Sequence, residues 1–181
     1  MPAVAAAAIT FLAAATLTPR AQTVNFDRAP RVGAMPIARQ IAPNLVTNDV
    51  RRLATIREQG KSYVLYASPT RSGSFCSWWI TSGGSRMGAC RGPGPDLQLQ
   101  ASGPRFAAYV TGSFDRKDVA RVAVRLATGA EVDVPFVWVT KPIGAGLFLF
   151  HASRRSAAAL ELPAAVTLYD ANGQVVETIT L

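Results

Sequence analysis

Two cysteines are the residues of this sequence with the most defined chemistry. Cys76 and Cys90 are the only cysteines, and the turn signal Ser-Gly-Gly-Ser at 82–85 lies between them. A hairpin with this turn places both on neighbouring strands, where a disulfide would contribute about 3 kcal/mol in the chain-entropy model. A metal site needs more ligands than this pair and the distant His151, and a redox site favours Cys-x-x-Cys spacing. We therefore predict a structural disulfide.

Two adjacent tryptophans, Trp78 and Trp79, follow the first cysteine. Adjacent strand residues point to opposite faces, so one indole faces outward if the other is buried. Arg71, Arg86 and Arg91 flank the pair in sequence. We predict a candidate binding surface of aromatic and cationic side chains that could stack on sugars, anionic glycans or a partner loop. The alternative is that a second sheet or the N-terminal arm covers the outward indole.

Catalytic motifs are not found in the sequence. The single histidine, His151, ends an apolar run, which is more typical of a strand-edge residue than of a general base. Gly83 and Gly84 lack the helix and lysine that phosphate binding requires, and no Gly-x-Ser-x-Gly motif or dinucleotide fingerprint occurs. The sequence predicts no catalytic residue and no cofactor. An enzyme of unfamiliar type remains the alternative and would require convergent carboxylates, or His151 in a pocket.

Acidic residues offer oxygen ligands, but not in metal-binding patterns. A calcium ion gathers about 6 to 8 oxygens. The residues that could contribute are Asp115, Asp118, Asp133, Asp170 and Asn172. Cations interleave the first two, and residues 170–173 match a turn in which Asn and Gly take left-handed conformations. We predict turns here and no metal site.

The net charge of +8 is unevenly distributed. Residues 1–105 hold 12 Lys and Arg against 4 Asp and Glu, whereas residues 106–181 hold 7 against 7. Arg accounts for 16 of the 19 cations, and its guanidinium binds phosphate or carboxylate bidentately. Arg-mediated binding of an acidic polymer is therefore an alternative function, although Arg, Ala, Gly and Pro are also what a GC-rich genome favours.

The N-terminal segment indicates export. The first seventeen residues carry no charge and have the length of a signal core, although no Lys or Arg precedes them. We predict a signal or membrane-anchor segment at 1–19, with a buried helix as the alternative. Pro30, Pro36 and Pro43 then predict a linker or extended arm at 20–47.

Two β-rich regions follow the arm. Residues 48–104 are predicted as an N-terminal β unit, with a helical turn at 48–53, strands at 53–56, 63–66, 75–80 and 86–90, and a Gly/Pro-rich boundary at 91–104. Residues 105–181 are predicted as a C-terminal domain with strands at 106–114, 119–126, 131–139, 146–152, 165–169 and 174–180. Short strands separated by turns indicate a mainly β fold, an antiparallel β-sandwich that is Ig-like or related.

The turn residues also predict strand register. A three-residue loop at 127–129 sets Val124 opposite Val132 and gives Gly129 the left-handed conformation that such loops require. The same loop type at 171–173 sets Leu168 opposite Val176. The three strands within 106–139 are expected to pair with one another.

A resemblance accompanies these patterns. The segments YVTGSFDRKDVARVAVRLATGAEVDVP, GLFLFHAS and AVTLYDANGQVVET resemble those of uncharacterised exported or membrane-anchored proteins of actinobacteria, over residues 48–181. The resemblance implies location and fold and assigns no functional residue. The resulting expectation is a non-enzymatic extracytoplasmic module that binds an envelope protein or glycan, or has a structural role. No nucleic-acid partner is expected, and the N-terminus could associate with the membrane.

Overall fold

The computed structural model describes residues 21–32, 49–58, 60–91, 96–101, 109–152 and 162–181. All regular elements in these ranges are β-strands, and every pairing between them is antiparallel except that of the first strand. The mainly β prediction is confirmed. Several predicted segments lie partly or wholly outside the described residues: the signal or anchor segment at 1–19, residues 20 and 33–47 of the arm, residue 48 of the helical turn, residues 92–95 and 102–104 of the boundary, and residues 106–108 of the strand at 106–114.

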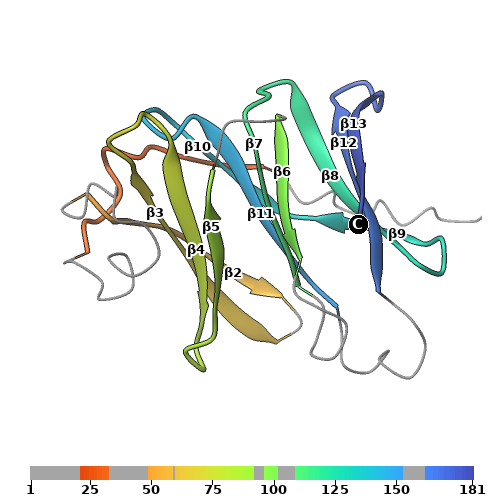
Figure 1. The fold of residues 1–181 in the computed structure, drawn as a ribbon, viewed down its shortest axis with the longest axis horizontal. Helices are drawn as coiled ribbons and strands as arrows, with labels where there is room; N and C mark the ends of the chain where they lie inside the picture. The colour runs from red at the N-terminus through yellow and green to blue at the C-terminus, as the bar shows by residue number, and fades with distance from the viewer. Residues whose placement is uncertain (1–20, 33–48, 59, 92–95, 102–108, 153–161) are drawn as a thin grey trace, which may run out of the picture.

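Strand pairing divides the strands into three sheets. The N-terminal sheet has the order β2 (Arg51–Glu58), β3 (Lys61–Pro69), β4 (Phe75–Thr81), β5 (Arg86–Cys90). The middle sheet has the order β1 (Gln22–Val24), β10 (Phe136–Val139), β11 (Ala145–His151), β7 (Tyr109–Phe114), β6 (Leu97–Ala101). The C-terminal sheet has the order β13 (Val175–Thr180), β12 (Pro163–Asp170), β8 (Val119–Leu126), β9 (Glu131–Val134). Figure 1 shows the middle sheet between the other two.

The middle sheet is buried on both faces at its centre. All seven residues of β11 are buried. Leu147 and Leu149 join a core shared with the N-terminal sheet, whereas Phe148 and Phe150 join a core shared with the C-terminal sheet. A strand covered on both faces requires a continuous apolar run, and β11 supplies one. The middle and C-terminal sheets thus form the sandwich, and the N-terminal sheet packs on its other side.

The segment predicted as one strand at 131–139 is two strands in two sheets. Pro135 separates β9, which belongs to the C-terminal sheet, from β10, which belongs to the middle sheet. Proline lacks the N–H that a ladder needs, so the strand breaks there and the chain changes sheets. The expected pairing of three consecutive strands holds for β8 and β9 but not for β7, which pairs with β6 and β11 in the middle sheet.

The two predicted hairpin registers have different outcomes. Val124 lies opposite Val132, and Gly129 has a φ of 88°, as predicted. The loop at 171–173 also forms, but Leu168 pairs with Glu177 and not with Val176. A register shift between Leu168 and Tyr169 explains the difference, because a β-bulge adds one residue to one strand.

Two strands lie in segments that carried no strand prediction. β1, within the predicted arm, pairs in parallel with β10, and β6, within the predicted boundary, pairs with β7. The helical turn at 48–53 is wrong over its described residues, since Val50 is buried and β2 begins at Arg51. Both extra strands add to the middle sheet, which is why the arm and the boundary are integral parts of the fold.

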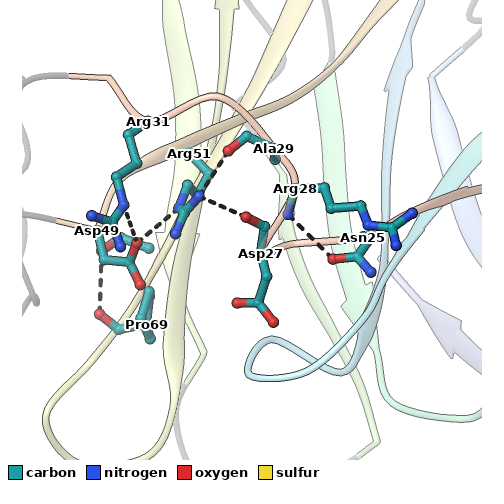
Figure 2. Close-up of polar contacts among 9 residues, drawn as sticks. Asn25, Asp27, Arg28, Ala29, Arg31, Asp49, Arg51 and Pro69 are labelled. Carbon is teal, nitrogen blue, oxygen red and sulfur yellow. Dashed lines mark hydrogen bonds and ion pairs between the residues drawn. The ribbon is translucent and has the colours of Figure 1, made fainter.

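Arg51, at the start of β2, binds the backbone of the predicted arm to the N-terminal sheet through hydrogen bonds (Figure 2). Its guanidinium donates to the backbone carbonyls of Asp27 at 3.1 Å and Ala29 at 2.8 Å, and its Nε pairs with Asp49 at 2.7 Å. The same group lies over the Phe26 ring, 5.2 Å from its centroid. Three hydrogen bonds, one of them to a carboxylate, and a ring contact compensate for the burial of this charge.

Candidate binding groove

The predicted disulfide is present. Cys76 on β4 and Cys90 on β5 are bonded to each other, and their strands pair directly at these two residues. The bridge ties the edge strand β5 to β4. Neither sulfur is a free thiol, so both cysteines contribute to structure and not to thiol chemistry.

Neither tryptophan presents an open aromatic face. Trp79 is 1% exposed and packs in the core between the N-terminal and middle sheets. Trp78, on the opposite face, is only 5% exposed because it packs with Val50 and Cys76, and Val32 of the arm packs against that cluster. The prediction of an outward indole is wrong, and its alternative, coverage by the N-terminal arm, describes the structure. The alternation rule holds, but each face is covered at the position of its tryptophan.

The three arginines of the predicted surface are not brought together as one site. Arg71 lies in the exposed loop after β3, and Arg86 is exposed at the start of β5. Arg91 is turned toward the middle sheet, where it donates to the Asp96 carbonyl at 2.8 Å and pairs with the Asp115 carboxylate at 3.2 Å. Arg91 therefore links the end of β5 to the segments beside β6 and β7.

A groove of about 140 Å³ lies between the N-terminal and middle sheets, at β4 and β5 on one side and β6 and β7 on the other. The N-terminal sheet contributes Phe75, Ser77, Trp79, Ala89 and Cys90, and Arg91 follows them. The middle sheet contributes Gln98, Leu99, Gln100, Thr111, Gly112 and Ser113. We refer to this feature as the groove.

The groove forms where the sequence changes from apolar to polar along one row of the middle sheet. Val137 pairs with Leu147, Leu147 with Ser113, and Ser113 with Gln98. The two apolar members of this row pack against the N-terminal sheet, whereas the two polar members line the groove. Apolar area drives sheet contact, so the sheets close tightly over β10 and β11 and separate over β6 and β7.

The groove offers neutral hydrogen-bonding groups. The middle sheet contributes two amides, Gln98 and Gln100, beside the hydroxyls of Ser113 and Thr111, and the N-terminal sheet contributes the hydroxyl of Ser77. Among the described residues that line it, Arg91 alone is charged, and it is paired. Pockets for drug-sized ligands measure about 300–1,000 Å³, so a groove of about 140 Å³ fits one unit of a larger partner better than a cofactor.

His151 was predicted to be a strand-edge residue, but it is a buried core residue. It is 2% exposed, its Nδ1 lies 3.0 Å from the Tyr63 hydroxyl, and Tyr109 stacks on its ring with centroids 4.4 Å apart. The physical reason is that β11 is an inner strand covered on both faces. Tyr63 and Tyr109 come from β3 and β7, so His151 joins two sheets.

The acidic residues considered as metal ligands make ion pairs and turns. Asp115, Asp118 and Asp133 pair with Arg91, Arg116 and Arg121, respectively. Asp170 accepts from the backbone N–H groups of Asn172 and Gln174, which confirms the predicted turn. No group of three or more His, Cys, Asp or Glu side chains that could hold a metal occurs in the part of the chain that the structure describes.

An ion-pair cluster covers the outer face of the C-terminal sheet. Arg121 pairs with Asp133 at 2.6 Å and Glu131 at 3.0 Å, and its guanidinium lies over the Tyr169 ring. The Tyr169 hydroxyl donates to Glu131 at 2.8 Å, and this bond, with a smaller contribution from Arg121, lowers the pKa of Glu131. Burial, reinforced by Glu131, raises the pKa of Tyr169. Since every charge here is paired, the cluster stabilises the sheet and leaves no reactive group.

Comparison of the chain with known protein families, with curated proteins and with solved structures finds no match. Among the described residues, no helix is long and apolar enough to cross a membrane. The groove was not predicted, because Gln98 and Gln100 lie in a segment interpreted as a boundary between Gly and Pro residues. The alternation Leu-Gln-Leu-Gln at 97–100 is the signal that identifies a two-faced strand there.

Proposed function

We propose that this protein is a non-enzymatic binding module that works outside the cytoplasm, in the cell envelope. It holds one unit of a larger partner, an envelope protein or a glycan, in the groove between β5 and β6. The observation that supports the proposal most is the groove's lining of neutral amides and hydroxyls. Such groups form hydrogen bonds with a sugar or a peptide backbone and do not require a charged ligand.

An extracytoplasmic location is supported by two independent features. The Cys76–Cys90 disulfide is stable in oxidising compartments and rare in the cytosol. The uncharged, apolar segment at 1–19 has the length of a signal core. The resemblance to exported actinobacterial proteins agrees with both features.

The binding proposal is tested by filling the groove. Ala89 is exposed on β5 and lines the groove, so Ala89→Trp places an indole in it. Ala120→Trp adds the same side chain at an exposed position on β8 and serves as the matched control. We expect wild type and the control to retain the same component from isolated envelopes, and Ala89→Trp to lose it while keeping its melting temperature. Equal retention by both variants would refute a binding role for the groove.

The location is tested with a reporter. A reporter fused after Gln40 is expected to be active only outside the cytoplasmic membrane. Activity confined to the cytoplasm would refute the envelope location and would also remove the oxidising environment that the disulfide requires.

A further inference from the structure

The outer face of the N-terminal sheet, which points away from the middle sheet, carries arginines at both edges. Strand register places them: Arg57 lies opposite Ser62, Arg52 opposite Tyr66, and Arg86 opposite Ile80. Their sequence neighbours Leu53, Ile56 and Met87 lie in or pack against the core on the inner face, so the arginines point outward. All three are exposed. We name Arg52, Arg57 and Arg86 the basic face.

The arginines of the basic face form no ion pair with the acidic side chains that the structure describes. By contrast, Arg116 and Arg121 near the C-terminal sheet are paired with Asp118 and Asp133, respectively. The sequence explains the contrast, because residues 50–91 hold seven Lys and Arg but one acid, Glu58. The positive potential of this sheet is therefore not neutralised within the described residues.

The spacing of the basic face suits an extended ligand. β2 and β5 are the two edges of a four-stranded sheet, so three strand spacings of about 4.8 Å separate them by roughly 14 Å. Arg52 and Arg57 lie on β2, on either side of Thr55. Arg86 lies on β5 in the same cross-strand row as Thr55. Val64 and Ile80, which are half-buried, lie between the edges and make the surface between the arginines apolar.

We infer that the basic face binds a linear acidic polymer, one that carries phosphate or carboxylate groups along its length. Arginine forms bidentate hydrogen bonds with both groups, and binding of several groups releases counterions. A bilayer is a poorer match, because the large apolar residues that are exposed among those described lie elsewhere: Val132, Leu162, Val175 and Leu181. Peripheral membrane binding relies on buried apolar area in addition to charge. This inference does not depend on the groove.

The test measures binding to long-chain inorganic polyphosphate and, separately, to polygalacturonate, which distinguishes phosphate from carboxylate. Three arginine contacts predict a slope of log K against log salt of about −2, and roughly 15- to 20-fold weaker binding at 200 mM than at 50 mM salt. The variant Arg52→Gln/Arg57→Gln/Arg86→Gln is expected to lose more than about tenfold in affinity at low salt. Each single substitution should make the slope shallower by about 0.7, because one phosphate or carboxylate contact is lost.

The matched control is Lys117→Gln/Arg125→Gln/Lys141→Gln, which removes the same charge from exposed positions elsewhere. Its affinity is expected to stay within about twofold of wild type, apart from weak long-range effects. Equal loss in both triple variants would show that net charge acts alone and would overturn the inference. So would an absence of binding to both polymers at low salt, or binding only to phosphatidylglycerol vesicles. Ala89→Trp should bind the polymers as wild type does, so failure of the groove and failure of the basic face are distinguishable.

Discussion

Gly146→Ala tests how the middle sheet packs against the C-terminal sheet. Gly146 lies opposite Phe114, and Gly112 lies opposite Phe148, so each phenyl ring covers a glycine on the neighbouring strand. A Cβ added at Gly146 would overlap the Phe114 ring. The ring has little room to move, because it packs edge-on against Phe136 with centroids 5.2 Å apart.

The expected cost follows from two opposing effects. An extra methyl group in a well-packed core costs about 1 to 3 kcal/mol. Replacement of glycine by alanine also lowers the conformational entropy of the unfolded chain, which stabilises the folded protein by about 0.4 to 1 kcal/mol. The difference between the two effects spans about 0 to 2.6 kcal/mol. Its midpoint, a net loss of about 1.3 kcal/mol in the free energy of unfolding, corresponds to a melting temperature lower by roughly 3 to 5 °C for a protein of this size.

Thermal and urea unfolding, with the disulfide intact, measure this loss. Gly83→Ala is the matched control, since its added Cβ would meet only the Thr81 hydroxyl oxygen, at 3.8 Å. Surface substitutions of this kind stay within about 0.5 kcal/mol of wild type. Similar melting temperatures for Gly146→Ala and the control would refute the packing described above.

A second background identifies the ring as the cause. Phe114→Leu destabilises the core by itself, but it leaves space beside Gly146. In that background Gly146→Ala should cost less than in wild type, and the difference is the coupling energy between neighbouring sites. An identical cost in both backgrounds would mean that Phe114 does not cover Gly146 and that the β7–β11 register is wrong.

Three further predictions concern the hairpins and one surface cluster. Mass spectrometry of non-reduced protein should show the β4–β5 disulfide, and reduction should lower the melting temperature; two free thiols in material from the oxidising side of the membrane would contradict it. Gly129→Val should lose about 1 to 3 kcal/mol because its φ is positive, whereas Thr128→Ser should be nearly neutral, as urea unfolding can check. Tyr169→Phe should raise the pKa of Glu131 toward its ordinary value in an NMR titration. A carboxylate whose pKa is lowered by folding contributes stability that is present above its unfolded pKa and is lost as the pH falls through its folded pKa. The variant should therefore lose less stability on acidification than wild type does. An unchanged pKa of Glu131 would contradict the role of the Tyr169 hydroxyl.

Local signals were sufficient to predict both hairpin loops and the register of one hairpin. Period-two alternation and a glycine in the third loop position give the pairing of Val124 with Val132 and the left-handed Gly129. Pairing between distant strands was not predictable in this way. β7 and β8 both alternate, and alternation identifies the buried face of a strand without identifying its partner.

The missed strands and the missed groove have one cause. β1 and β6 are short, and both lie in segments whose Gly and Pro residues indicate a linker, so the Leu-Gln alternation of β6 was outweighed by its surroundings. Their stability comes from pairing with β10 and β7, which is a tertiary effect that overrides local propensity. The prediction about the tryptophans was wrong for a related reason, since the arm that covers Trp78 was expected to be an open linker.

The polar row of the middle sheet is the feature that burial alone does not explain. β10 and β11 present Val137 and Leu147 to the N-terminal sheet, and apolar residues at Gln98 and Ser113 would extend that contact across β6 and β7. Each polar residue there forgoes the stabilisation that an apolar side chain would gain on burial. Departures from the simplest stable pattern concentrate at functional sites. Because the groove uses the inner face of β5 and the basic face uses the outer face of the same sheet, both proposed sites depend on one small sheet whose edge strand is held by the disulfide.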